Sequence, residues 1–344
     1  MSFRQTTKIY LLGWYGKGGL ADDIIGECIK KALFDKAREK GVDIGFVEKS
    51  NESDLVVVGG GSLLGFDSLK LSKKLNKMEK PIVIFGAGYR REKRTLNEES
   101  RNAFKKILSK VSLIGVRGYV SKQMLLQNRI IEDGEVEVIG DPALLFSPTS
   151  VRNFEGEFRI GMVTRNMSRF EPQYVTNHIM QRTFAALGDY LAQRFRARIF
   201  FFSFTENIFE SDIKGAKKTI SFMKHGDQAE IIPRVSQPRK LGSMMGKMNL
   251  VVSQRLHPSI LAWVQEVPSI AFEYQFNKTI DVMNSIGMDE FVIRTDEFFL
   301  DSYIKKLDRL LKENEIIMSQ AKISIDYWKK RLSNFAERTL DILA

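Results

Sequence analysis

The feature that most constrains the fold of this chain is the alternation of short apolar runs with amphipathic stretches. The apolar runs are continuous, as in Leu55–Val58, Ile82–Phe85 and Leu250–Val252. Continuous runs of this length are typical of parallel strands that are covered on both faces. Stretches with helical periodicity lie between the runs, among them Asn97–Lys110 and Pro172–Arg194. The pattern therefore predicts an α/β fold with doubly wound parallel sheets.

The same pattern predicts two domains. One series of apolar runs ends near residue 147, a polar stretch follows, and a second series begins at Ile160. We expect an N-terminal Rossmann-like domain at residues 1–147 and a C-terminal Rossmann-like domain at residues 156–295, with a cleft between them. Residues 296–344 have a long amphipathic pattern without glycine or proline. They are expected to form one or two helices that pack across both domains, with a membrane-surface helix as the alternative.

The chain is strongly basic, and its formal net charge of +11 indicates an anionic partner. The densest basic cluster is Arg90, Arg91, Lys93 and Arg94, which a solvated loop also explains. No helix-turn-helix, zinc-finger or stacked-aromatic pattern accompanies the charge, so we expect no nucleic acid. Phosphorylated substrates and peripheral contact with an anionic membrane are the expected partners.

Cysteine and histidine are scarce, because the chain has one cysteine and three histidines. A disulfide framework or a Cys/His zinc site is therefore not expected. The first residues show no secretory signal pattern, and every apolar run is far shorter than the roughly 20 residues that span a bilayer. We expect a cytoplasmic protein, with its membrane contact at the inner face.

The first glycine-rich segment, GWYGKGGLADDII at Gly13–Ile25, follows the first predicted strand and precedes a helix. Such a loop lines the ligand edge of a doubly wound sheet, and the glycines Gly16 and Gly18 allow backbone amides to approach an anion. The spacing does not match a dinucleotide-binding fingerprint. Asp22 and Asp23 are explained equally well as helix-capping acids and as a base or hydrogen-bond acceptor for a sugar hydroxyl.

Two further strands of the N-terminal half end in glycines. DLVVVGGGSLLG places Gly60, Gly61 and Ser62 after a buried strand, and IFGAGYRR at Ile84–Arg91 is followed by positive charge. Three successive glycines expose backbone amides without side-chain obstruction, which favours a ligand-binding turn over a merely tight one.

The C-terminal half places cationic side chains at strand ends. RIGMVTRN puts Arg165 after its first predicted strand, where a guanidinium could bind a carboxylate or a phosphate. The most specific segment is Asn249–Tyr274, in which a buried strand leads directly into Arg255 and His257 before a helix that begins at Pro258. This strand-to-helix junction predicts an anion-binding or catalytic site.

These segments, in this order, resemble the polysaccharide pyruvyl transferase family over roughly residues 8–295. The opening segment is similar to the family's G-Y-Y-G-x-G-N-x-G-D-E-x-I, and IGVRGYVSKQML and VIGDPALLF match further N-terminal landmarks. SQRLHPSILAWVQEVPSIAFEYQFNKTIDVMNSIG matches the C-terminal signature of arginine-leucine-histidine followed by V-P and a Y-x-x-K-like segment. The chain departs from the opening motif at Gly19, where the family has asparagine, and at Ala21, where it has glycine.

The resemblance implies a GT-B-like fold and a transferase of polysaccharide biosynthesis that moves a pyruvyl ketal group from phosphoenolpyruvate to a sugar. It implies donor binding or catalysis by Arg255, Leu256, His257 and Arg165, and an acceptor role for the N-terminal glycine-rich loops. No cofactor or metal is expected beyond the donor substrate. The acceptor is expected to be a sugar on a lipid-linked saccharide, a nucleotide sugar or a polymer end.

Within this reading, His257 either transfers a proton or binds phosphate. Asp22 or Asp23 is the candidate base, and Asp22 is the one assigned to catalysis. Two alternatives remain open at the level of sequence. One is a nucleotide-sugar glycosyltransferase, for which Glu273 would contact the donor ribose. The other is a non-catalytic saccharide-binding homologue, suggested by the altered opening motif.

Overall fold

The computed structural model describes residues 6–65, 74–90, 98–166, 176–207, 210–273, 278–294 and 300–343. The chain divides into two compact units. The first unit comprises Met1–Tyr15, Ile25–Leu145 and Asp326–Ala344. The second unit comprises Gly16–Ile24 and Phe146–Ile325.

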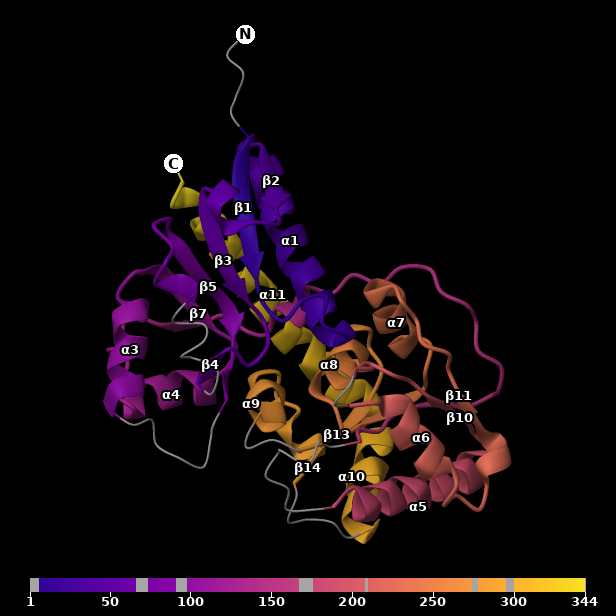
Figure 1. Cartoon of the computed structure of the whole chain (residues 1–344). Helices are drawn as coiled ribbons and strands as arrows, with labels where there is room; N and C mark the ends of the chain where they lie inside the picture. The colour runs from indigo at the N-terminus through magenta and orange to yellow at the C-terminus, as the bar shows by residue number, and fades with distance from the viewer. Residues whose placement is uncertain are drawn as a thin grey trace. The chain divides into compact units, whose positions relative to one another are not determined.

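The first unit is built on a parallel six-stranded sheet of order β2-β1-β3-β5-β7-β8 (Figure 1). Its central strands β3 and β5 are apolar and buried along their whole length, which is typical of a parallel sheet with helices on both faces. A two-stranded parallel ladder of β4 and β6 is separate from this sheet. The strands and helices are β1 (Thr7–Leu12), α1 (Leu20–Lys40), β2 (Ile44–Val47), β3 (Leu55–Gly59), β4 (Leu64–Gly65), β5 (Ile82–Ala87), β6 (Tyr89–Arg90), α3 (Glu98–Leu108), β7 (Val111–Val116), α4 (Tyr119–Gln127) and β8 (Glu137–Val138).

The second unit is built on another parallel six-stranded sheet, of order β11-β10-β9-β12-β13-β14. Helices α5, α6 and α10 pack together, and α7, α8 and α9 form a second packed group (Figure 1). The order of the strands reverses direction at the pair β9 and β12, which is where doubly wound sheets bind ligands. The elements are β9 (Arg159–Val163), α5 (Asn177–Phe195), β10 (Arg198–Phe201), α6 (Asp212–Ile220), β11 (Ala229–Ile231), α7 (Pro238–Met245), β12 (Leu250–Ser253), α8 (Leu256–Val264), β13 (Ser269–Phe272), α9 (Lys278–Ser285), β14 (Val292–Ile293) and α10 (Leu300–Lys312).

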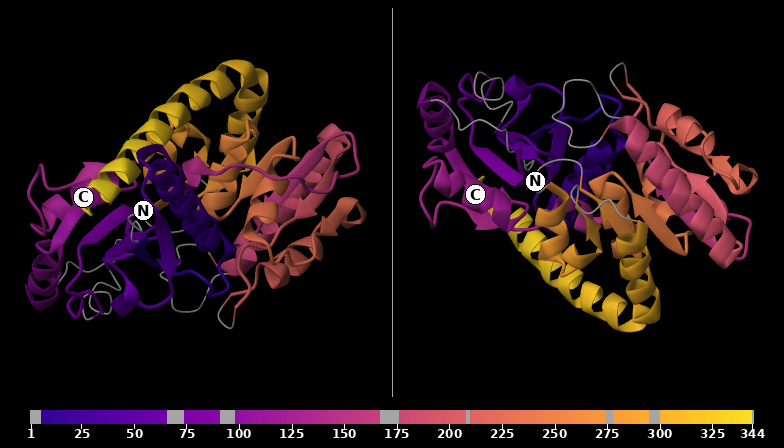
Figure 2. Two further views of the ribbon diagram at one scale, coloured as in Figure 1. Left: turned by 90° about the horizontal axis from the view of Figure 1, so that it is seen from above. Right: turned by 90° about the horizontal axis from the view of Figure 1, so that it is seen from below.

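The last helix, α11 (Asn314–Asp341), is one continuous rod in both views of Figure 2. Its residues up to Ile325 group with the second unit, and those from Asp326 onward group with the first. In the first unit, Trp328 packs on the backbone at Gly140, and Nε of Arg331 donates to the carbonyl of Val138 at 3.0 Å. This apolar and polar anchoring explains why the end of the chain belongs with the N-terminal sheet.

The predicted fold class is confirmed, because both sheets are parallel, six-stranded and of the doubly wound type. Prediction of single elements was less complete. The edge strand β2 was not predicted, since its sequence IGFV is short and contains a glycine. Helices α7 and α9 were also not predicted, because each has only eight residues. None of the described helices is long and apolar enough to cross a lipid bilayer.

Candidate active site

The candidate site of the second unit begins where β9 and β12 end side by side. The two strands pair in parallel with Val163 opposite Ser253, so the residues that follow them emerge at the same edge. Gln254 joins the two ends, because its Oε1 accepts a hydrogen bond of 2.8 Å from the amide of Arg165. The sheet thus brings Arg165 and Arg255 together, although they are far apart in sequence.

Helix α8 begins immediately after β12, with Arg255 in extended conformation at the N-cap. Ser253 fixes this junction, since its Oγ accepts from the amide of Arg255 at 2.9 Å and donates to the carbonyl of the same residue at 2.7 Å. Leu256 is buried in the core, and His257 is 7% exposed in the first helical turn. The partial positive charge of a helix N-terminus adds to the positive charge of Arg255 at this point.

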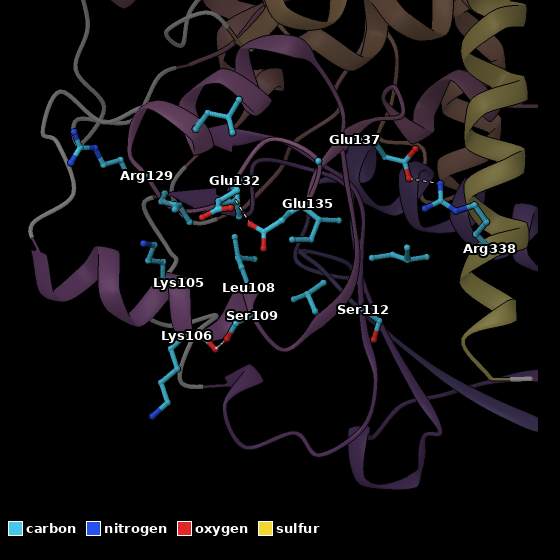
Figure 3. Close-up of a pocket in the computed structure, with 17 residues that line it drawn as sticks. Lys105, Lys106, Leu108, Ser109, Ser112, Arg129, Glu132, Glu135, Glu137 and Arg338 are labelled. Carbon is cyan, nitrogen blue, oxygen red and sulfur yellow. Dashed lines mark hydrogen bonds and ion pairs between the residues drawn. The ribbon is translucent and has the colours of Figure 1, made fainter.

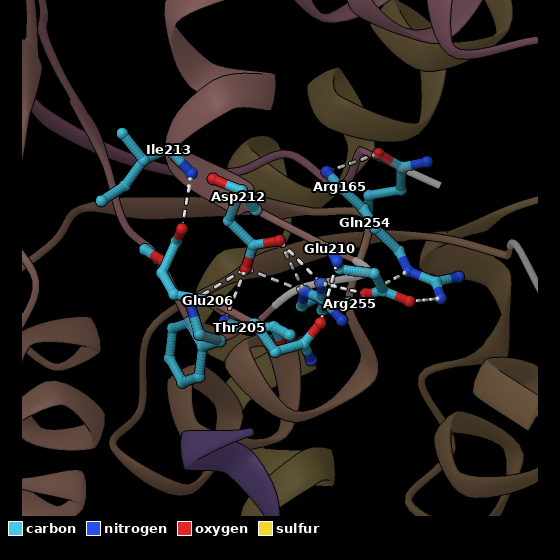
Figure 4. Close-up of polar contacts among 12 residues, drawn as sticks. Arg165, Thr205, Glu206, Glu210, Asp212, Ile213, Gln254 and Arg255 are labelled. Atoms are coloured by element: carbon cyan, nitrogen blue, oxygen red, sulfur yellow. Dashed lines mark hydrogen bonds and ion pairs between the residues drawn. The ribbon is translucent and has the colours of Figure 1, made fainter. Parts of the chain in front are cut away.

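A single carboxylate, that of Glu210, links the two arginines (Figure 4). Its Oε1 accepts from Nη2 of Arg165 at 2.5 Å and its Oε2 from Nε of the same arginine at 3.2 Å. The same Oε2 accepts from Nη2 of Arg255 at 2.8 Å. Two guanidinium groups from adjacent strands therefore converge on one oxyanion.

A second carboxylate, that of Asp212, orients Arg255 from the first turn of α6. Asp212 is buried and accepts hydrogen bonds from Nε and Nη2 of Arg255. Its Oδ2 also accepts from the amides of Phe204 and Thr205, each at 2.9 Å. With these contacts Asp212 fixes both the loop after β10 and the position of the arginine.

The two carboxyl groups respond differently to this environment. Burial alone would raise the pKa of Glu210, but hydrogen bonds and charge from Arg165 and Arg255 outweigh it and lower the pKa to about 2. For Asp212, burial raises the pKa, whereas Arg255 and the two backbone amides act in the opposite direction. Glu210 is thus a carboxylate that its two cations strongly stabilise in the ionised form.

The opening glycine-rich segment is part of this same unit. The amide of Leu20 donates to the carbonyl of Phe204 at 2.9 Å, and Gly19 forms an antiparallel bridge with Thr205. The amide of Glu206 donates to the carbonyl of Gly18 at 3.2 Å. These backbone bonds explain why residues 16–24 group with the C-terminal sheet, although the predicted N-terminal domain included them.

This pairing brings Asp22 into the electrostatic environment of α8. Burial raises the pKa of Asp22, while His257, Lys278 and Arg255 lower it in part. The neighbouring Asp23 makes a different contact. Its Oδ1 accepts a hydrogen bond from the amide of Gly16 at 2.6 Å, which closes the glycine-rich loop before α1. Of the two acids that the sequence left equivalent, Asp22 is the one that interacts with the cations of the site.

The second glycine-rich turn lies in the first unit. Gly60 has a φ of +65°, and a Cβ there would lie 2.1 Å from Cγ2 of Ile25, so only glycine fits. The amide of Gly60 donates to the carbonyl of Phe85, and the carbonyl of Gly61 accepts from the amide of Gly88. Gly60, Gly61 and Ser62 thus form a tight turn at the carboxyl end of β3.

Sequence reasoning did not assign a site role to Glu210, Asp212 or Lys278. Glu210 and Asp212 flank Ser211, whose Oγ accepts from the amide of Lys214 as an N-cap, so the acids resemble ordinary helix-start residues. Lys278 was quoted only as part of a family-like segment. Two acids at the start of α6 are a signal for a counter-charge, but the sequence pattern does not show that their partner is Arg255, which is distant in sequence.

Figure 3 shows a pocket of about 1110 Å³ in the first unit, between α3, β7 and the segment that follows α4. It contacts the amino-terminal part of β7, Val111–Ile114, and mixes basic with acidic side chains. The glycine-rich turns lie at the opposite, carboxyl end of the strands, where doubly wound sheets bind ligands. The pocket is therefore not part of the candidate site.

The remaining predicted features concern metals and the basic cluster. Among the described residues, no group of three or more His, Cys, Asp and Glu side chains could hold a metal ion. Of the basic cluster, Arg91, Lys93 and Arg94 lie outside the described residues, and Arg90 is the last residue of β6.

A model of the family described as polysaccharide pyruvyl transferase matches residues 6–275. The chain belongs to this family. The match covers both glycine-rich turns, both site arginines and His257, and it ends before Lys278. The resemblance that the ordered motifs indicated is thus confirmed, and no curated protein matches the chain.

Solved structures similar to this pyruvyl transferase family member show the fold. MnaA of S. aureus, solved with UDP, is 13% identical with a TM-score of 0.58 and covers 92% of this chain and 91% of its own. A glycosyltransferase of Rickettsia africae is 10% identical with a TM-score of 0.58 and 99% coverage of both chains. The UDP-GlcNAc 2-epimerase of Neisseria meningitidis, bound to UDP-GlcNAc, is 12% identical with a TM-score of 0.56, covering 97% of this chain and 99% of its own. The predicted GT-B-like fold is confirmed.

Proposed function

We propose that this protein transfers a pyruvyl group from phosphoenolpyruvate to a sugar of a polysaccharide precursor, and that the second unit binds the donor. One observation carries the proposal. Arg165 and Arg255, at the ends of two adjacent strands, both donate to the carboxylate of Glu210. Two guanidinium groups directed at one oxyanion suit a donor that has a carboxylate and a phosphate.

In this proposal, Glu210 occupies the place that an oxyanion of the donor takes. Its low pKa supports this role, because it reflects how strongly the two arginines favour a negative charge there. The donor displaces Glu210, and Arg255 stays in position because the buried carboxylate of Asp212 holds its other side. Nε2 of Gln254, a buried donor that has no hydrogen-bond partner within the described residues, supplies a further contact next to Arg165.

The chemistry requires one proton at the methylene carbon of phosphoenolpyruvate and two new C–O bonds at the adjacent carbon. One sugar hydroxyl attacks that carbon, the bond to phosphate breaks, and a second hydroxyl closes the cyclic ketal. Of the two hydroxyl protons, one balances the new methyl group and the other leaves with phosphate. Arg165 and Arg255 stabilise the departing phosphate.

His257 and Asp22 are the proposed proton-transfer pair. His257 lies at the N-terminus of α8, and it interacts electrostatically with Asp22. Because burial raises the pKa of Asp22, this carboxylate is a stronger base than an exposed aspartate. We assign to Asp22 the removal of the proton from the attacking hydroxyl and to His257 the protonation of the methylene carbon.

The acceptor in this proposal is a sugar on a lipid-linked saccharide or a nucleotide sugar, which the basic chain reaches in the cytoplasm or at the inner face of an anionic membrane. Nucleotide-sugar glycosyl transfer is the competing function, since the structural relatives include proteins solved with UDP and UDP-GlcNAc. Glu273 was the residue assigned to a donor ribose in that alternative. Its Oε2 accepts from the amides of Thr279 and Ile280, each at 2.9 Å, and caps α9. Because these hydrogen bonds already occupy its carboxylate, Glu273 is less suited to bind the ribose of a nucleotide-sugar donor.

Ligand-dependent thermal stability tests the proposal, because a ligand of the native state raises the melting temperature. Millimolar phosphoenolpyruvate should stabilise the wild-type protein and should not stabilise an Arg165→Met variant. Phosphate release from phosphoenolpyruvate in the presence of a panel of glycan acceptors then measures transfer. Stabilisation by UDP-GlcNAc with none by phosphoenolpyruvate would replace the proposal with glycosyl transfer.

A further inference from the structure

The first unit buries an arginine, Arg117, that forms no ion pair with the residues that the structure describes. Arg117 follows β7 directly, at the carboxyl end of the strand, and its accessible surface is 0%. None of its three guanidinium nitrogens has a hydrogen-bond partner among the residues that the structure describes. By contrast, the buried arginines of the second unit, Arg165 and Arg255, both form ion pairs with the carboxylate of Glu210.

The backbone makes room for this guanidinium at Gly88. A Cβ at that position would lie 2.4 Å from both Cζ and Nε of Arg117. Gly88 is not among the described glycines with a positive φ, so its conformation does not require glycine. A side chain at this position would displace the guanidinium, because the guanidinium lies against the main chain.

An unpaired buried guanidinium is costly, since arginine stays protonated in proteins and buried charges are normally paired. Methionine or another apolar side chain of similar size would pack there without that cost. Arg117 therefore destabilises the fold unless an anion compensates its charge. This cost points to a binding role for Arg117.

The position of Arg117 agrees with such a role. Its amide donates to the carbonyl of Ala87, and the amide of Gly88 donates to the carbonyl of Gly61 at 2.7 Å. The guanidinium thus adjoins the glycine-rich turn Gly60–Ser62 at the carboxyl edge of the first sheet. This edge is where sheets of this type bind their ligands.

We propose that Arg117 binds a phosphate group of the sugar acceptor. The identity of the ligand as an acceptor rests on the proposed function, in which both acceptor classes, a nucleotide sugar and a lipid-linked saccharide, carry phosphate. A guanidinium presents parallel N–H groups to two oxygens of a phosphate, and this geometry gives both strength and orientation. Because the side chain is fully covered, the segment that contains Gly88 moves when the phosphate binds.

The first experiment measures thermal stability of the full chain with inorganic pyrophosphate and, separately, inorganic phosphate. The variants are Arg117→Met, Gly88→Ala and, as a matched control, the exposed Arg338→Met of the same unit. We expect Arg117→Met to melt at a higher temperature than the wild type without ligand, and to lose stabilisation by pyrophosphate. Gly88→Ala should also weaken this stabilisation, since its Cβ displaces the guanidinium, and Arg338→Met should keep it.

The second experiment separates the sources of the phosphate. In transfer assays with a nucleotide sugar and with a polyprenyl-diphosphate saccharide, Arg117→Met should raise the KM of the acceptor that is used by about tenfold to a hundredfold. The KM of phosphoenolpyruvate should not change. An Arg117→Met protein that melts earlier and is still stabilised by pyrophosphate would show a structural role and overturn the proposal.

Failure of the proposed function gives a different result. If phosphoenolpyruvate neither stabilises the wild type nor releases phosphate, while stabilisation by pyrophosphate still depends on Arg117, the phosphate site stands and the pyruvyl transfer does not. If phosphoenolpyruvate is a donor and the KM of both acceptors is unaffected by Arg117→Met, the pyruvyl transfer stands and the phosphate site is refuted.

Discussion

The carboxylate of Asp212 holds the guanidinium of Arg255 through two of its nitrogens. Nη2 of the arginine lies 2.6 Å from Oδ1, and Nε lies 2.9 Å from Oδ2. Both contacts with Asp212 come from the Nε and Nη2 edge of the planar guanidinium. Nη2 also donates a hydrogen bond to Glu210. The geometry of the site therefore depends on the shape of arginine as well as on its charge.

Replacement of Arg255 by lysine tests that dependence. Lysine keeps the charge but cannot contact Asp212 and a second oxyanion in the same plane, so the KM of phosphoenolpyruvate should rise about tenfold to a hundredfold. Steady-state kinetics measure this change. The matched control is Arg152→Lys in the same unit, since Arg152 is half-exposed and pairs with Glu230, away from the two arginines of the site. Equal kinetics of Arg255→Lys and the wild type would exclude a planar clamp.

His257→Ala should reduce the turnover number by a factor of about 100 to 10,000 and should leave the melting temperature nearly unchanged. The reason is the proposed transfer of a proton to the methylene carbon. A parallel loss of donor affinity would instead assign His257 to phosphate binding. His178→Ala is the control, because this histidine is exposed on α5. A stable His257→Ala protein with normal transfer would remove the catalytic assignment.

Glu210→Gln should increase the affinity for phosphoenolpyruvate about tenfold, because the donor no longer competes with an ionised carboxylate for Arg165 and Arg255. Titration calorimetry measures this affinity directly. If Glu210 instead helps to build the donor site, the same variant binds phosphoenolpyruvate more weakly. The sign of the change therefore decides between a place-holder and a structural role.

The stability of the protein in acid should also depend on Glu210. Its pKa is lowered from 4.5 to about 2 in the folded state, so the unfolded chain binds more protons between these values. The stabilisation, about 3 kcal/mol for a shift of this size, is fully present above pH 4.5 and is lost as the pH falls toward about 2. Denaturant unfolding of the wild type and Glu210→Gln across this range should show a difference that shrinks toward low pH. A difference that does not vary with pH would contradict the ion-pair explanation.

Asp22→Asn should abolish the acidic limb of the pH–rate profile. As the proposed base, Asp22 must be ionised, and its pKa is raised above the ordinary value of 3.8, so activity should rise with pH through a midpoint above 3.8. The turnover number of the variant should be about 100 to 10,000 times lower. Asp35→Asn, on the same helix and paired with Lys31, is the control that should keep the limb. Retention of the limb in Asp22→Asn would assign it to another group.

Much of this protein follows from local patterns in its sequence. Continuous apolar runs between helical stretches predicted parallel sheets, because strands covered on both faces need no polar side. The ends of those runs also placed Arg165 and Arg255 correctly after strands, since a strand end is a local feature. His257 lies in the first turn of α8, which begins at Leu256 and not at Pro258 as predicted. The ordered motifs indicated the family that the comparison confirmed.

The counter-charges were decided only by the tertiary structure. Glu210 lies 45 residues from either arginine, and before folding it resembles any acid at the start of a helix. Likewise, backbone pairing of Gly19 with Thr205 brings Asp22 into the charged surroundings of His257. The burial of Arg117 against Gly88 joins two strand ends that have no common pattern. The sequence by itself determined which side chains follow the strands. The pairing and burial that set their charge states came from contacts between distant segments, because Coulomb interactions and desolvation depend on distance in space.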